Sequence, residues 1–184
     1  WNGGACCGQA ANGDVDDVDF IETVVADVGE RSCIDEKRVY ATGMSNGGFM
    51  SNRLGCESAD VFAAIAPVAG VLGIDEADCN PVRPVPIMHF HGTNDLLVNY
   101  DGGLLFIGAQ ESVAIWAARN GCGEERSVTF ENGAVTCESY DGCTETTLCT
   151  IAGAGHCWPG QGFCNDDISA SEAMWTFFSG HALP

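Results

Sequence analysis

Basic residues are scarce in this sequence of 184 residues. Lys37 is the only lysine, and 26 acidic residues against 7 basic ones give a formal net charge of −19. Nucleic acids and anionic membrane surfaces are bound by clustered lysine and arginine side chains. We therefore expect neither nucleic acid nor a membrane among the partners of this protein.

Long apolar runs and the Cys-x-x-Cys spacing of zinc ribbons are also absent. No stretch approaches the roughly 20 apolar residues that a membrane-spanning helix needs. Hydrophobic residues nevertheless make up 46% of the chain, which is enough for a packed core. We therefore interpret residues 1–184 as a single domain.

Cysteine, in contrast, is abundant, with 11 residues. Such a density is typical of an oxidising compartment, so we expect a secreted protein with several disulfides. Because eleven is odd, one cysteine should be free or bonded to a missing N-terminal segment or a second chain. The adjacent Cys6 and Cys7 should take different partners. The pairs we expect are Cys7–Cys33, Cys56–Cys79, Cys122–Cys149, Cys137–Cys143 and Cys157–Cys164.

Apolar strand-like segments alternate with helical patterns along the chain. A helix over 14–29, capped by Asp14, should carry Val18 and Val28 on its buried face. Alternating elements with short connections predict a three-layer α/β sandwich with a mostly parallel sheet. Further helices are expected over 46–57, 110–120 and from Ser169 or Ser171 to Phe178, and strands over 38–42, 62–68, 86–91, 127–130, 135–140 and 147–151.

A Gly-x-Ser-x-Gly sequence lies between the 38–42 strand and the helix that follows it. This is the layout of a nucleophile elbow, which holds a serine on a tight strand-to-helix turn with its hydroxyl exposed. The candidate nucleophile is Ser45. We expect glycine at 43 and 47 because side chains there would crowd the turn. The backbone N–H of Asn46 should supply one oxyanion-hole donor.

Two further candidates follow Ser45 in the chain. Asp95 comes just after the 86–91 strand, and His156 lies in a glycine-rich loop after the 147–151 strand. The order Ser, Asp, His matches the triad of α/β-hydrolases and differs from those of chymotrypsin and subtilisin. His156 would act as general base, and Asp95 would hold its tautomer. Asp101 follows the same strand and is the alternative to Asp95.

Other polar and aromatic side chains near these candidates are open to two interpretations. His89 and His91 share one face of their strand, a spacing that can bind a metal. No third ligand is evident, so we favour a buried, hydrogen-bonded pair and predict no metal site. Trp158 could line an aromatic or acyl pocket for the substrate, or simply pack against its neighbours; the sequence favours neither alternative.

Four motifs carry a resemblance to a known family. Together with the upstream Cys6-Cys7-Gly8 segment, they resemble the secreted feruloyl esterases and polyhydroxybutyrate depolymerase-like esterases, which are α/β-hydrolases. The resemblance implies a serine carboxylic ester hydrolase with no metal or organic cofactor and with Ser45, Asp95 and His156 as its triad. It points to hydroxycinnamoyl esters of plant polysaccharide as substrates, cleaved through an acyl-enzyme. The motifs span residues 43–48, 68–70, 91–95 and 155–160.

One departure from the family concerns the N-terminal region. Family members carry several strands before the Cys-Cys-Gly segment, and a loop after one of them donates the second oxyanion N–H. This chain starts at Trp1 without them, so we expect an N-terminally incomplete α/β-hydrolase domain. The alternatives within the class are a polyhydroxybutyrate or polyester depolymerase and an acetyl esterase. The alternative from another class is a non-catalytic binding or structural remnant of a hydrolase.

Overall fold

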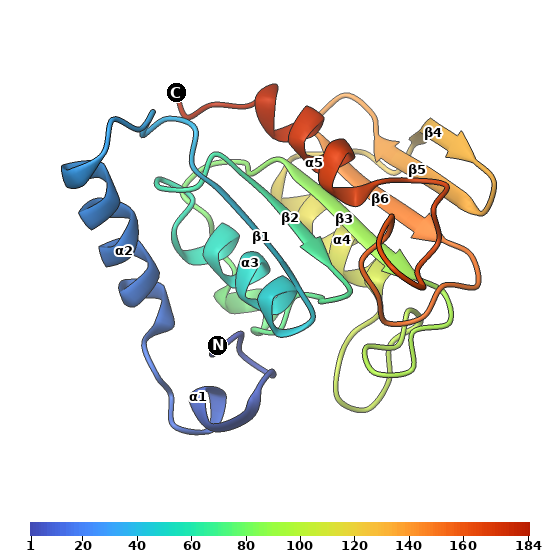
Figure 1. Cartoon of the computed structure of the whole chain (residues 1–184), viewed down its shortest axis with the longest axis horizontal. Coiled ribbons are helices and arrows are strands. Elements are labelled where there is room, and N and C mark those ends of the chain that lie inside the picture. The colour runs from blue at the N-terminus through green and yellow to red at the C-terminus, as the bar shows by residue number, and fades with distance from the viewer.

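One six-stranded sheet forms the centre of the computed structural model, which describes all residues 1–184 (Figure 1). The strand order is β1-β2-β3-β6-β5-β4, so β1 and β4 are the two edges. The first four strands in this order are parallel, and β5 and β4 run antiparallel to their neighbours. The strands are β1 (Tyr40–Met44), β2 (Ala64–Val68), β3 (Ile87–Gly92), β4 (Arg126–Asn132), β5 (Val135–Tyr140) and β6 (Thr146–Ile151).

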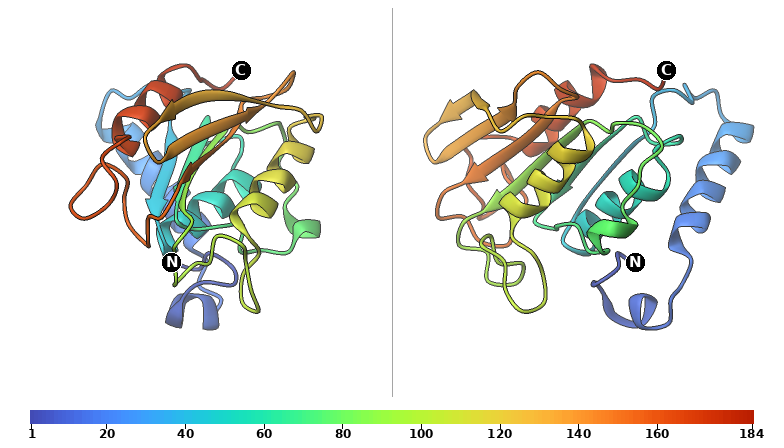
Figure 2. Two further views of the ribbon diagram at one scale, coloured as in Figure 1. Left: turned by 90° about the vertical axis from the view of Figure 1, so that its right-hand side faces the viewer. Right: turned by 180° about the vertical axis from the view of Figure 1, so that it is seen from behind.

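Helices cover both faces of this sheet, which gives the expected three layers. Helix α5 packs on one face, and α4 lies on the other, as the edge-on view in Figure 2 shows. Helices α2 and α3 share the face of α4. The helices are α1 (Gly8–Asn12), α2 (Asp17–Arg31), α3 (Asn46–Glu57), α4 (Ala109–Arg119) and α5 (Ala170–Ser179), with a short 3₁₀ turn at Glu76–Asp78.

The alternation of side chains along β2 explains why both faces must be covered. Ala66 and Val68 pack toward Phe177 of α5, whereas Ile65 packs on the opposite face against Trp116 of α4. Successive residues of a strand point to opposite faces, so a strand buried on both sides is a continuous apolar run. Every residue of β2 is buried.

The expected elements are present, with shifted ends. Helix α2 begins at Asp17 and is capped by Asp16, whose carboxylate accepts a hydrogen bond from the Asp19 N–H at 3.1 Å. Asp14, the expected cap, instead lies in a turn with a φ of 47°. Val18 is buried as expected, but Val28 is 43% exposed because the end of α2 stands away from the sheet (Figure 1).

The disulfides confirm two expected pairs, Cys56–Cys79 and Cys157–Cys164. The pairs Cys122–Cys149 and Cys137–Cys143 are wrong. The register of β5 and β6 places Cys137 directly opposite Cys149, and these two residues are bonded to each other. Cys122, after α4, is therefore left to bond with Cys143 in the turn between the two strands.

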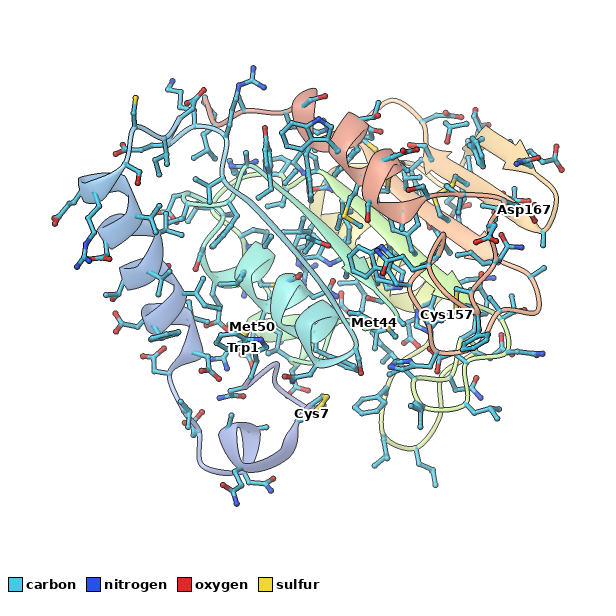
Figure 3. All side chains as sticks on the ribbon, viewed as in Figure 1. Trp1, Cys7, Met44, Met50, Cys157 and Asp167 are labelled. Carbon is cyan, nitrogen blue, oxygen red and sulfur yellow. A yellow bond between two sulfur atoms is a disulfide. The ribbon has the colours of Figure 1, made fainter.

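The expected Cys7–Cys33 pair is also wrong, because Cys33 is exposed and free. The sulfur atoms of the adjacent Cys6 and Cys7 lie next to each other, and the partner that each of them takes stays a prediction. Helix α2, with 15 residues and a length of about 22 Å, separates Cys7 from Cys33. Figure 3 shows Cys7 beside α1, which precedes α2, whereas Cys33 follows the last residue of α2 in the chain.

No helix of the protein combines the length and the apolar character that a membrane crossing requires.

Candidate active site

The turn between β1 and α3 holds Ser45 in an unusual backbone conformation. Its φ is 56° and its ψ is −119°, a strained combination that is rare for residues other than glycine. The Ser45 N–H donates to the carbonyl of Val68 at 2.9 Å, which ties the turn to the end of β2. The N–H groups of Gly48 and Phe49 donate to the carbonyl of Ser45 at 2.8 and 3.0 Å. Helix α3 therefore starts directly after the serine.

The two motif glycines have different reasons for lacking a side chain. A Cβ at Gly43 would lie 2.7 Å from the carbonyl carbon of Gly47, so the turn excludes any side chain at position 43. A Cβ at Gly47 would have no atom within 4 Å apart from its chain neighbours and the backbone of α3. The expected crowding is therefore found at Gly43 and is wrong for Gly47.

Asp95 lies in the turn that follows β3 and is fully buried. Its Oδ1 accepts hydrogen bonds from the N–H groups of Leu97 and Val98, both at 2.9 Å. Its Oδ2 lies 2.7 Å from Nδ1 of His156. Both carboxylate oxygens are thus used, and Asp95 presents one of them to the imidazole. Asp101, the alternative acid, is exposed.

The loops after β3 and β6 are bonded to each other, which places His156 beside Asp95. The N–H of Asn94 donates to the carbonyl of Ala154 at 2.8 Å. In return, the N–H of Gly153 donates to Oγ1 of Thr93 at 2.8 Å. Both bonds lie just before Asp95 and His156 in the two loops, and they hold these two residues side by side. The sequence patterns did not indicate either bond. Only 14% of the His156 side chain is exposed.

Ser45 lies at the same edge of the sheet as this pair, namely the edge formed by the carboxyl ends of the parallel strands. Strands β1, β3 and β6 are parallel, so the residues that follow them emerge together. Figure 3 shows Met44 and Cys157, the chain neighbours of the serine and the histidine, at this edge. The structure joins His156 to Asp95, while the Ser45 hydroxyl makes no hydrogen bond to His156 and does not cap α3.

Two further predicted residues lie near this edge. The N–H of Asn46 is in the first turn of α3, where backbone donors have no acceptor within the helix. Its side-chain amide donates to the carbonyl of Trp1 at 2.8 Å. The indole N–H of Trp158 donates to Oγ of Ser171 at 3.1 Å, and its ring packs against the core under α5. Trp158 therefore has a packing role, and its contact with substrate stays a prediction.

The histidine pair on β3 is buried and hydrogen-bonded, as the sequence favoured. Nε2 of His89 lies 2.9 Å from Nδ1 of His91, and Nε2 of His91 lies 2.8 Å from the carbonyl oxygen of Val98. Burial lowers the pKa of both imidazoles, that of His89 well below 6.5. No group of three or more histidine, cysteine or acidic side chains is arranged to hold a metal ion.

Comparisons with known proteins place this geometry in context. Residues 7–81, which include the Ser45 turn, match a family model described as the prolyl oligopeptidase family. Feruloyl esterase B of Piromyces equi is 42% identical over 172 residues, which cover 85% of this chain and 31% of that protein. The probable feruloyl esterase C of Aspergillus niger is 30% identical over 173 residues, covering 91% of this chain and 59% of that protein.

Two other similar proteins are also esterases. The putative esterase NocK of Nocardia uniformis is 31% identical over 171 residues, or 80% of this chain and 50% of that protein. Among solved structures, an acetyl xylan esterase from Aspergillus awamori has a TM-score of 0.59 at 16% identity, covering 88% of this chain and 67% of that one.

The fold, a mostly parallel sheet between two helical layers, is that of an α/β-hydrolase. Within this class the chain is similar in sequence to feruloyl esterases. It spans between 31% and 59% of the length of the curated relatives described here.

Proposed function

We propose that this protein is a serine carboxylic ester hydrolase of the feruloyl esterase type, with Ser45, Asp95 and His156 as its triad. The observation that carries the proposal is the 2.7 Å contact between buried Asp95 and His156 at the edge where the strained Ser45 turn emerges. A hydroxyl is a poor nucleophile until a base takes its proton. The imidazole of His156 is the base at this edge of the sheet.

In the first half of the reaction, Oγ of Ser45 attacks the ester carbonyl and its proton passes to Nε2 of His156. The Asp95 carboxylate accepts a hydrogen bond from Nδ1, which leaves Nε2 free as the base and stabilises the imidazolium. His156 then gives the proton to the departing alcohol, and the acyl group stays on Ser45. In the free enzyme the Ser–His bond is often long, and it shortens when substrate is bound.

In the second half, water replaces the alcohol. His156 takes a proton from the water, the hydroxide oxygen attacks the acyl carbon, and Ser45 recovers its proton as the acid leaves. The Asn46 N–H is the donor proposed for the negatively charged carbonyl oxygen in both halves. One such donor contributes about 3 kcal/mol to transition-state stabilisation.

Exposed apolar side chains in the loop after Asp95 favour an acyl group with a substantial apolar part. Leu97 is 71% exposed, and Leu104 and Leu105 are fully or mostly exposed. A groove of 460 Å³ runs along residues 97–106 and is lined mainly by hydrophobic side chains. A feruloyl group has the aromatic surface to cover part of such a groove, whereas an acetyl group is too small. None of the three triad side chains lines this groove, so its use by the acyl group is part of the proposal.

The test is hydrolysis of methyl ferulate beside p-nitrophenyl acetate, with Ser45→Ala as the inactive variant. Ser127→Ala is the matched control, because Ser127 is an exposed serine on the edge strand farthest from β1. A fluorophosphonate probe, which labels activated serines, is applied to the same three proteins. We expect turnover of both esters and labelling of wild type and Ser127→Ala, and neither in Ser45→Ala.

The other outcomes separate the alternatives. Turnover of the acetate alone contradicts the feruloyl assignment and leaves an acetyl esterase or a polyester depolymerase, which hydrolysis of a polyhydroxybutyrate film then distinguishes. Folded protein that is neither labelled nor active contradicts the enzyme and favours the non-catalytic remnant.

The four disulfides between cysteines distant in the chain support a secreted location, because such bonds persist in oxidising compartments. Exposed Cys33 is the residue available for the expected link to a further segment or a second chain. A single 19.3 kDa band without reductant would contradict a link to a second chain.

A further inference from the structure

The position of the Asp95 carboxylate depends on the two peptide groups that follow it. Oδ1 of Asp95 is held by the N–H groups of Leu97 and Val98, so any movement of this turn moves the carboxylate. The Val98 side chain is buried, with 4% of its surface exposed. The turn is therefore anchored at Val98, and what holds Val98 also holds Asp95.

A side chain from β3 bonds to the other end of the same residue. Nε2 of His91 lies 2.8 Å from the Val98 carbonyl oxygen, and the His91 side chain is fully buried. Nε2 also faces Oδ2 of Asp95 at 3.5 Å. His91 thus connects a rigid strand of the sheet to the turn that carries the acid.

The tautomer of His91 follows from its partners. A carbonyl oxygen can only accept, so Nε2 of His91 must carry the proton and Nδ1 must accept. His89 then has to donate from its own Nε2, over 2.9 Å. Its Nδ1 is left without a hydrogen-bond partner. The opposite tautomer of His91 would place a lone pair against the carbonyl oxygen of Val98.

We infer that His91 is a positioning residue for the acid of the triad, and that the hydrogen bond from His89 supports the tautomer in which His91 donates to Val98. The inference rests on the proposed function, because it gives Asp95 its role. His89 donates to His91, and His91 donates to the carbonyl oxygen of Val98. The N–H of Val98 in turn donates to the carboxylate of Asp95. Burial keeps both imidazoles neutral by lowering their pKa values, so the chain carries no charge of its own.

A matched pair of substitutions separates this role from simple packing. In His91→Gln the side-chain amide nitrogen takes the place of Nε2 and can donate to Val98. In His91→Asn the amide nitrogen takes the place of Nδ1 and cannot reach Val98. Both replacement side chains are polar and smaller than histidine. A role in packing alone therefore predicts similar losses of kcat in the two variants.

Two measurements, kcat and a proton NMR signal, report on the acid, and a third, nitrogen-15 NMR, reports on the tautomer of His91. We expect kcat of His91→Asn to fall about 10- to 100-fold, as for other misplacements of about 1 Å, and kcat of His91→Gln to stay near wild type. The low-field proton NMR signal of the His156–Asp95 bond should weaken or shift in His91→Asn and persist in His91→Gln. Nitrogen-15 spectra should show wild-type His91 protonated at Nε2 and His89→Leu with a mixture of tautomers at His91.

The inference is overturned if the two His91 variants have equal kcat and equal low-field signals, or if wild-type His91 carries its proton on Nδ1. If His91→Asn does not fold, the nitrogen-15 spectra of wild type and His89→Leu decide the matter. Absence of wild-type turnover would count against the proposed function alone, because both NMR readouts are independent of activity.

Discussion

Nδ1 of His156 lies 2.7 Å from Oδ2 of Asp95, although 61 residues separate the two in the chain. The contact exists because β3 and β6 are adjacent parallel strands whose loops emerge side by side. It also distinguishes Asp95, which is buried at this contact, from Asp101, which is exposed six positions later. Sequence order alone left both acids as candidates.

Replacing Asp95 with asparagine should abolish most activity. The new side-chain amide would still accept from Leu97 and Val98 but would present an N–H group to His156, which selects the wrong tautomer. A loss in kcat on the order of 10⁴ is expected for such a change. Asp101→Asn is the matched control and should retain wild-type turnover of methyl ferulate. Equal losses in the two variants would show that the acid has been misassigned.

The buried histidines should make the protein less stable in mildly acidic solution. Burial lowers the pKa of His89 and His91 in the folded state, whereas the unfolded chain takes up protons near pH 6.5. The unfolded state therefore binds more protons below that pH, and the free energy of unfolding falls as pH falls. Each histidine contributes a loss of up to about 1.4 kcal/mol per pH unit. Urea unfolding at pH 7.5 and at pH 5.5 measures this loss in the free energy of unfolding.

A variant of one buried histidine tests the origin of that loss. His89→Gln cannot be protonated, so its stability should decline less steeply between the two pH values than that of wild type. His181→Gln is the control, since His181 lies at the surface beside Glu145. A decline of the same size in wild type and His89→Gln would assign the effect to other groups.

Much of the fold could be predicted because its signals are local. The apolar run of β2, the Gly-x-Ser-x-Gly turn and the Ser169 cap of α5 each lie within a few consecutive residues. The disulfide pairs could not be predicted in the same way, because Cys137 and Cys149 are brought together by strand register. Register is a property of two segments and leaves no mark in either one alone.

The candidate site shows the same division. Ser45 and His156 could be proposed from their turns, and Asp95, with Asp101 as its alternative, from the position after a strand. The bonds that hold them, such as those of Thr93 with Gly153 and of His91 with Val98, join loops to loops or a strand to a loop. Such bonds depend on how the loops pack, and loop packing has no periodic pattern in sequence.

The Cys137–Cys149 bond should contribute substantially to stability. It closes a loop of sequence separation 12 between two buried residues, for which a contribution of about 3 kcal/mol is expected. Replacing both cysteines with alanine should lower the free energy of unfolding by about that amount. Peptide mapping without reductant provides the independent check, because Arg126, Glu138 and Glu145 allow proteases to separate the four cysteines. A peptide joining Cys122 to Cys149 would refute the pairing.

The two motif glycines should respond differently to alanine. In Gly43→Ala the new Cβ would lie 2.7 Å from the Gly47 backbone, which cannot move without displacing α3. We expect a loss of about 1–3 kcal/mol in the free energy of unfolding, the usual cost of overpacking. In Gly47→Ala the Cβ meets no atom within 4 Å apart from its chain neighbours and the backbone of α3, and alanine favours a helix over glycine by about 1 kcal/mol. Urea unfolding of both variants should therefore show changes of opposite sign, and similar losses in the two would contradict this account of the turn.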